Sequence, residues 1–213
     1  MRLKKVKGAH EKILNHEYVI QDSKQCCGKW KQVFSNDREI HIEIGMGKGD
    51  FIIEKAKRYP MINFIGIEKF DSVLVRALEK VDALEEPLPN LKFIRMDALE
   101  IDQVFQKEIQ TIYLNFSDPW PKNRHEHRRL SSTIFLEKYD CLFQNQKEII
   151  MKTDNRKFFE YSLMNIANYG YHLEEVSLDL YQDDIKDNIP TEYETRFHNR
   201  GMKIYRLVAR KEN

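Results

Sequence analysis

The stretch EIHIEIGMGKGDFIIEKAKRY, residues 39–59, contains the turn that decides the fold. Its first seven residues are rich in isoleucine and have the length of a buried β-strand. Gly45 ends this run, and Gly47 and Gly49 follow directly. The next segment, DFIIEKAKRY (50–59), has a helical pattern, with Asp50 as a candidate N-cap and Pro60 as a stop. The stretch therefore predicts a strand, a tight glycine turn and a helix in direct succession.

The same alternation continues along the chain. Further strands are expected at 63–69, 91–97, 111–118 and 147–154, and helices at 71–86, 131–143 and 155–170, the second of these capped by a serine. Strands that alternate with helices predict βαβ units and a parallel sheet with right-handed crossovers. After Gly170, the runs YHLEEVSLDLY (171–181) and MKIYRLVARK (202–211) are strand-like, and we expect only a polar loop at 182–201 between them. Such strands should pair antiparallel. The predicted fold class is therefore α/β, a doubly wound sheet of about seven strands with an antiparallel C-terminal end.

Length and composition fit one globular domain. The chain has 213 residues, is 41% hydrophobic and 32% charged, and carries a net charge of only +1. We expect a basic N-terminal arm at 1–30 and one domain at 31–213. The N-terminus MRLKKVKGAHEK has no apolar h-region behind it, and no apolar run approaches the roughly 20 residues of a membrane helix. Cys26, Cys27 and Cys141 show no CxxC spacing, which favours free thiols. These features predict a cytoplasmic protein without a membrane anchor.

Acidic residues close successive predicted strands. Glu43 precedes the glycine turn, whose G-x-G-x-G spacing differs from the G-x-G-x-x-G of dinucleotide-binding proteins. A carboxylate there suits a ligand with an ammonium or sulfonium group and would repel a pyrophosphate. Glu68, 25 residues later, could accept hydrogen bonds from ribose hydroxyls. Asp97 could bind an adenine amine, or cap the next helix. Since the carboxyl ends of parallel strands form one edge, these acids predict a cofactor site there.

The segment SDPWPKNRHEHRR (117–129) follows the fourth strand. Asp118 is another strand-end acid, and Trp120 lies between two prolines that restrict the backbone. Trp120 could stack on a flat base, or simply plug the sheet edge. The cationic tail behind it is typical of a segment that contacts phosphates. His125 and His127 raise the alternative of a metal site, but no further His or Cys ligands lie at suitable spacing, so we expect no metal.

Two later segments add polar candidates. Asp154 ends the fifth strand in KTDN and could serve a ligand or cap the next helix. The segment IPTEYETRF (189–197) precedes the last strand and could close over a substrate.

Taken together, these residues resemble the bacterial tRNA (guanine-N7)-methyltransferases. The resemblance runs from about residue 30 to the C-terminus and is carried by EIGMGKG (43–49), SDPWPKNRHEHRR (117–129) and PTEYETRF (190–197). It implies a Rossmann-like class I methyltransferase fold that binds S-adenosylmethionine and methylates a variable-loop guanine of tRNA, as a monomer or a homodimer.

The resemblance also implies residue roles. The cofactor site would comprise Glu43, Gly45, Gly47, Glu68, Asp97 and Asp118. Apart from the resemblance, the need for a carboxylate that tolerates a cation makes Asp118 the expected catalytic residue. Contacts to the target nucleotide would come from Lys122, Asp154, Thr191, Glu192, Tyr193 and Glu194. The RNA-binding segment would comprise Arg124, His125, Glu126, His127, Arg128 and Arg129.

Three alternatives stay open at this point. A nicotinamide-dependent dehydrogenase is disfavoured by the glycine spacing and Glu43. A non-catalytic RNA-binding module is disfavoured by the intact acids at four strand ends. An adenine-N6 methyltransferase would commonly place D/N-P-P-Y/F/W after strand four, where this chain has Trp120 at the second proline position.

Overall fold

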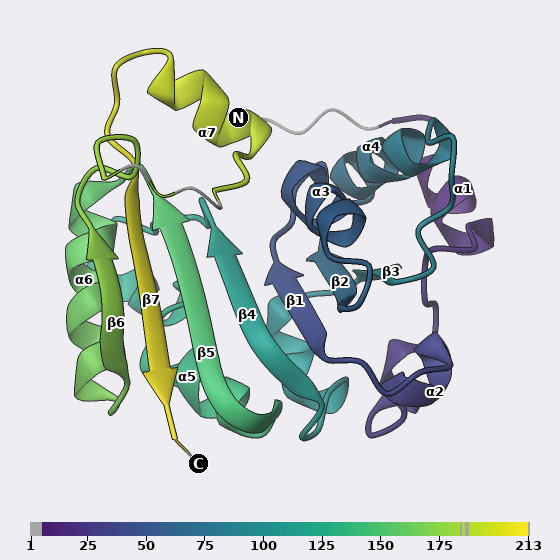
Figure 1. Cartoon of the computed structure of the whole chain (residues 1–213), viewed down its shortest axis with the longest axis horizontal. Coiled ribbons are helices and arrows are strands. Elements are labelled where there is room, and N and C mark those ends of the chain that lie inside the picture. Colours follow the sequence, from purple (N-terminus) through teal and green to yellow (C-terminus); the bar gives the residue numbers. More distant parts are fainter. Residues whose placement is uncertain (1–5, 184, 186–187, 213) are drawn as a thin grey trace.

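The computed structural model describes residues 6–183, 185 and 188–212, and a seven-stranded sheet lies at its centre (Figure 1). The strands are β1 (Ile40–Ile44), β2 (Asn63–Glu68), β3 (Leu91–Arg95), β4 (Ile109–Asn115), β5 (Phe143–Thr153), β6 (His172–Ser177) and β7 (Tyr205–Lys211). Their order is β3-β2-β1-β4-β5-β7-β6. Every neighbouring pair is parallel except the two that include β7. The predicted mixed α/β sheet with an antiparallel C-terminal strand is confirmed.

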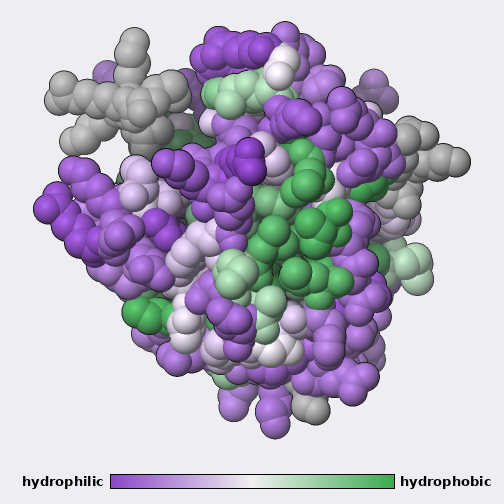
Figure 2. Space-filling model, turned by 90° about the vertical axis from the view of Figure 1, so that its left-hand side faces the viewer, coloured by the Kyte–Doolittle hydropathy of each residue, from purple (hydrophilic) through white to green (hydrophobic). Residues whose placement is uncertain are grey.

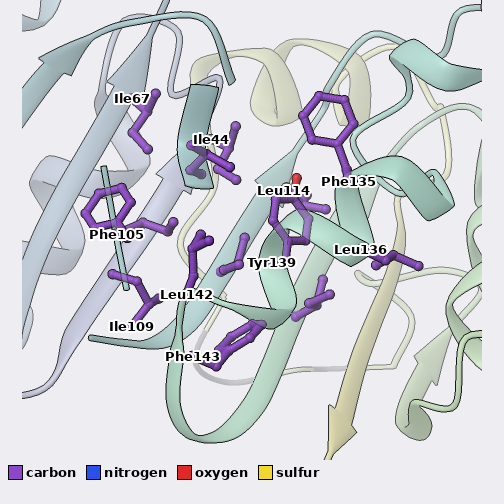
Figure 3. Close-up of a cluster of buried hydrophobic side chains, with 14 of the residues drawn as sticks. Ile44, Ile67, Phe105, Ile109, Leu114, Phe135, Leu136, Tyr139, Leu142 and Phe143 are labelled. Atoms are coloured by element: carbon purple, nitrogen blue, oxygen red, sulfur yellow. The ribbon is translucent and has the colours of Figure 1, made fainter. Parts of the chain in front are cut away.

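Helices cover both faces of this sheet (Figure 1). One face is covered by α1 (Ala9–Asn15), α3 (Asp50–Arg58) and α4 (Asp71–Asp82), whose buried residues form one core with Phe64 and Phe93. The other is covered by α2 (Trp30–Phe34), α5 (Thr133–Asp140) and α6 (Arg156–Asn168). Short 3-10 helices span η1 (Ser23–Cys26), η2 (Ala98–Gln103) and η3 (Asn123–Arg128). Figure 3 shows the second core, where Phe135 and Tyr139 of α5 lie beside Ile44 and Leu114 of the sheet.

The site lies where the order of strands reverses, between β1 and β4. From β1 the chain winds outward through β2 and β3, and it then returns to place β4 on the other side of β1. Ligands bind at such a switch point, beyond the carboxyl ends of the strands. All five residues of β1 are buried, as expected for a strand covered on both faces. Ile40, Ile42 and Ile44 belong to the core under α5, so Glu43 points to the opposite face, towards α3.

The sequence predictions fail at specific places. Residues 182–201 were expected to form a polar loop, but α7 (Glu192–His198) lies within them, over the carboxyl ends of β4 and β5 (Figure 1). Its signal was the spacing of Thr191 and Glu194, which form a capping box. Asp50 is also not an N-cap: Gly49 occupies that position with φ 79°, and Asp50 lies in the first turn of α3. Strand four ends at Asn115 rather than residue 118, so Asp118 lies in the loop beyond it.

The described part of the predicted basic arm packs against the domain. Ile13 and Tyr18 are buried in the core shared with α3 and α4, and the Tyr18 hydroxyl accepts a hydrogen bond from the Leu88 N–H at 2.7 Å. Lys12 Nζ lies 2.5 Å from an oxygen of Asp82 on α4. Trp30 is fully buried, and its indole N–H donates to the Val104 carbonyl.

The sheet ends at β6, whose open edge carries exposed apolar side chains. Leu173 and Val176 on β6, and Leu178 beyond it, are all exposed, and apolar side chains gather on this side of the molecule (Figure 2). Assembly as a monomer or a homodimer stays a prediction. Within the described part of the chain, every helix is too short or too polar to cross a bilayer.

Candidate active site

The glycine turn after β1 opens a space above the sheet. Gly45, Gly47 and Gly49 all have positive φ, and the N–H groups of Gly45 and Met46 donate to the Ile67 carbonyl, which fastens the turn to β2. A Cβ placed on Gly45 or Gly47 would meet no described atom within 4 Å, whereas one on Gly49 would lie 2.9 Å from the Ala77 Cβ. The first two glycines therefore leave room for a ligand, and the third allows α3 to pack on α4.

A cavity of about 570 Å³ lies over this turn. Three segments supply most of its wall: the glycine turn, the end of β4 with Asn115 and Phe116, and α7 with Glu192, Tyr193 and Arg196. Its size suits a small organic ligand. Lys48 Nζ lies 2.8 Å from Glu192 Oε2, so an ion pair joins the turn to α7 across the cavity. The missed helix α7 is therefore one wall of the site.

Glu43 and Asn115 form a buried pair in this cavity. The Asn115 amide N–H donates to Glu43 Oε1 at 2.8 Å. Their other oxygens, Glu43 Oε2 and Asn115 Oδ1, accept no hydrogen bond from any residue that the structure describes. Burial raises the pKa of Glu43 to about 8. Two buried acceptors beside the cavity therefore lack a donor among the described residues, and a ligand that donates hydrogen bonds would satisfy them. Asn115 was not predicted as a site residue, although a polar side chain closing an otherwise apolar strand was a visible signal.

Glu68 lies beside the same turn but has several partners already. It accepts hydrogen bonds from the N–H groups of Gly47, Lys69 and Phe70, at 3.1, 2.8 and 2.9 Å. Burial raises the pKa of its carboxyl. Because Oε2 accepts only from Gly47 in the described structure, it retains capacity for a ligand hydroxyl.

Asp97 lies in a neighbouring cavity of about 460 Å³, lined by residues of the 21–25 segment together with Lys69 and Arg95. Its side chain caps η2 through the Leu99 N–H, and Lys69 Nζ lies 2.6 Å from its other oxygen. Asp97 therefore does cap the next helix, as one reading of the sequence suggested. Glu68 connects the two cavities, since it contacts Gly47 in one and the Lys69 backbone in the other.

The Asp-Pro-Trp-Pro loop has a strained backbone. Phe116 and Trp120 adopt φ of 51° and 38°, values that residues with bulky side chains rarely adopt. Arg129, which is only 9% exposed, donates to the carbonyls of Pro119 and Trp120 and lies over the Tyr161 ring. Arg129 therefore holds the backbone of this loop in place. Asp118 is exposed, and its charge acts on both Glu68 and Tyr193.

Trp120 is half-buried between basic residues of the tail. The Arg128 guanidinium lies 4.9 Å from the centre of its ring, and His125 makes an edge contact. Lys122, Arg124 and Arg128 are exposed, whereas Arg129 is buried. Within the described residues, no group of three or more His, Cys, Asp or Glu side chains could hold a metal ion.

α7 joins the ends of β4 and β5. Tyr193 packs its ring 5.0 Å from Phe116, and its hydroxyl hydrogen-bonds to Asp154. Burial raises the pKa of Asp154, which does not cap α6: Asn155 does. Thr191 uses its hydroxyl to cap α7, while Glu192 and Tyr193 are exposed.

Glu194 instead points into the protein and is fully buried. Lys152 of β5, also buried, places Nζ 2.5 Å from its Oε2. Asn188 and Tyr181 donate to the other oxygen of Glu194. This pair anchors α7 to the sheet. The signal for it was a lysine inside an otherwise buried strand, which requires a partner, but the partner lies 42 residues away in the sequence.

Comparisons with known proteins agree with this geometry. A family described as "Putative methyltransferase" matches residues 37–207. A protein called tRNA (guanine-N(7)-)-methyltransferase from Geobacillus sp. (strain WCH70) is 50% identical over 212 residues, covering 99% of this chain and 96% of the relative. One of the same name from Lachnoclostridium phytofermentans is 48% identical, covering 100% and 99%.

Solved structures support the fold alone. The chain superposes on an antibiotic-related methyltransferase with a TM-score of 0.65 at 16% identity, covering 87% of this chain and 94% of the other. It superposes on the 16S rRNA methyltransferase KamB with a TM-score of 0.64 at 13% identity and the same coverage.

Proposed function

Because the chain belongs to the tRNA (guanine-N(7)-)-methyltransferase family, we propose that it transfers a methyl group from S-adenosylmethionine to N7 of a variable-loop guanine in tRNA, forming 7-methylguanosine. Membership in this family excludes the dehydrogenase and the non-catalytic module. Since the substrate is tRNA, we place the reaction in the cytoplasm.

The observation that carries the choice of donor is the pair of bare acceptors on Glu43 and Asn115 over the glycine turn. S-adenosylmethionine, when bound, supplies an electrophilic methyl group on a sulfonium, and it carries an ammonium group. A cavity whose buried acceptors lack donors fits such a ligand. Glu43, Gly45 and Gly47 would hold its amino-acid end, Glu68 a ribose hydroxyl and Asp97 the adenine amine.

The reaction places modest demands on the protein. Guanine N7 has an in-plane lone pair and carries no hydrogen, so no general base has to remove a proton before attack. Positive charge passes from the donor to the product base. The protein must align the reacting atoms and surround them with groups that tolerate a cation. Asp118 and Asp154 suit this task, because the charges of both act on Tyr193 in the site.

Residues beyond the cofactor cavity would hold the RNA. Lys122, Asp154, Thr191, Glu192 and Tyr193 would contact the target nucleotide. Glu194 would act on it through the position of α7, because its carboxylate is buried. The segment Arg124 to Arg129 would contact the tRNA, with the exposed Arg124 and Arg128 as its phosphate-binding cations and His125, Glu126 and His127 lying between them. Extruding the guanine costs a few kcal/mol, of which stacking on a side chain such as Trp120 could offset about 1–3 kcal/mol.

The test of the proposed function is nucleoside analysis of unmodified tRNA after incubation with the protein and S-adenosylmethionine. We expect 7-methylguanosine, absent when the tRNA carries adenine at the variable-loop position. Methylation of adenine, or of a guanine atom other than N7, would contradict the proposal.

Neutralising the exposed tail should weaken tRNA binding in a salt-dependent way. The triple variant Lys122→Gln, Arg124→Gln, Arg128→Gln removes three charges that face solvent and spares Arg129. Each lost phosphate contact should reduce the slope of log K against log salt by about 0.7–0.9. We expect a slope shallower by roughly 2–2.7, measured by filter binding across a salt series.

The matched control neutralises Lys31, Lys57 and Lys107, which are also exposed but lie at the opposite, N-terminal edge of the sheet. Its slope should equal that of the wild type. Equal slopes for both triple variants would remove the tail from the RNA interface.

A further inference from the structure

Asn115 occupies the last position of β4, directly beside Glu43 at the switch point. Its exposed fraction is 6% and that of Glu43 is 1%. One hydrogen bond, from the Asn115 amide N–H to Glu43 Oε1, joins the two side chains and uses one polar atom of each. The atoms left over are Asn115 Oδ1 and Glu43 Oε2, and both residues line the cavity.

Two buried acceptors without donors are a costly arrangement unless a ligand completes them. No described residue donates to either atom, the cavity-lining cations Arg76 and Arg196 included. Lys152 is held by Glu194, and Lys80 by Asp50. Lys48 is engaged by Glu192. The missing partner must therefore be a donor group that enters the cavity, and a group with several N–H bonds and a positive charge satisfies both acceptors at once.

We propose that Asn115 is a donor-recognition residue, whose Oδ1 accepts a hydrogen bond from the ammonium group of the methyl donor while Glu43 Oε2 accepts a second one. This rests on the proposed function, since it concerns the same cofactor. It adds Asn115 to the site and gives it two roles. Asn115 orients the Glu43 carboxylate, and it binds the ammonium group directly.

The electrostatics of Glu43 supply an independent readout. Burial is the main cause of its raised pKa, and Asp50 of α3 and Glu68 of β2 raise it further, while Asn115 and Lys152 of β5 lower it. With a pKa of about 8, the free carboxyl is mostly protonated at neutral pH, so Glu43 offers Oε2 as a carboxylate acceptor only once that proton leaves. An ammonium group against it favours the carboxylate, so binding should release about one proton between about pH 6 and 7.

The experiment is isothermal titration calorimetry with two probes. S-adenosylhomocysteine carries the ammonium group, and its deamino analogue, in which hydrogen replaces the amino group, lacks it. The wild type should prefer the first probe strongly. Asn115→Leu, of similar volume, should reduce that preference by about tenfold or more, the effect of losing one hydrogen bond to a charged group. Titrations in buffers of different ionisation enthalpy should show proton release with S-adenosylhomocysteine and not with its deamino analogue.

Two control variants test whether a changed preference comes from a loss of structure. Asn115→Asp keeps an acceptor at the same place and should retain the preference for the amine. Thr111→Val removes a buried hydroxyl on the same strand, bonded to Glu148 and remote from the cavity, and should leave the preference unchanged. Retained preference in Asn115→Asp together with a reduced one in folded Asn115→Leu separates recognition from packing.

The outcomes are distinct. If wild type binds both probes equally, or folded Asn115→Leu keeps the full preference, the inference is wrong, while the proposed function stands. If wild type binds neither probe, the proposed cofactor itself is wrong.

Discussion

Asp118→Ala abolishes formation of 7-methylguanosine and leaves the affinity for tRNA largely unchanged: this is the expected result for the acid in the Asp-Pro-Trp-Pro loop. Asp118 is exposed beyond the end of β4, and its charge acts on Glu68 on the cofactor side and on Tyr193 on α7. Removing one preorganised group that stabilises charge costs on the order of 100- to 1,000-fold in kcat. We expect at least that loss, because Arg129 fixes the backbone carbonyls of Pro119 and Trp120, next to Asp118, before substrate arrives.

The measurement is single-turnover methyl transfer with labelled donor, together with filter binding of tRNA. Asp37→Ala is a matched control, since Asp37 is an acid on an exposed loop at the far edge of the sheet. Asp118→Asn separates charge from shape and should be nearly as inactive as Asp118→Ala. Near-wild-type turnover by either Asp118 variant would remove this residue from the catalytic step.

The second large effect concerns stability. Lys152→Met should lower the free energy of unfolding by about 3–5 kcal/mol, the usual cost of leaving one member of a buried ion pair without its partner. Glu194 is fully buried and would keep a charge with no cation beside it. For a chain of this size the melting temperature should fall by about 2–4 °C per kcal/mol, measured by circular dichroism or calorimetry.

Lys147→Met on the same strand is the matched control. Lys147 pairs with Asp140 at 2.6 Å, but that pair is partly exposed, so its loss should cost no more than about 1 kcal/mol. The double variant Lys152→Met, Glu194→Leu removes both charges and should regain most of the stability. Its methyl transfer should nevertheless stay low, because α7 also loses the bonds from Asn188 and Thr191 to Glu194. Equal destabilisation by Lys147→Met and Lys152→Met would show that the pair does not anchor α7.

Much of the fold follows from local patterns. The strands are apolar runs covered on both faces, and the helices between them have one apolar face, so β1 to β5 and their parallel pairing were predictable within a few residues. α7 was missed because it is short and polar and packs little apolar surface. Its stability comes from the Thr191–Glu194 capping box and from Lys152, a partner distant in sequence.

The site was predictable in part for the same reason. Glu43 and Glu68 end strands, and a parallel sheet brings such ends to one edge. The Glu43–Asn115 bond depends on which strands are neighbours, and the inward turn of Arg129 and Glu194 depends on packing. No local pattern distinguishes a buried arginine that braces a loop from an exposed one that binds phosphate.

The most direct test of the whole account is a crystal structure with S-adenosylhomocysteine bound. We predict that the ligand lies over Gly45 and Gly47, with its amino group against Glu43 and its ribose near Glu68. A ligand bound elsewhere, with both carboxylates far from it, would contradict the account.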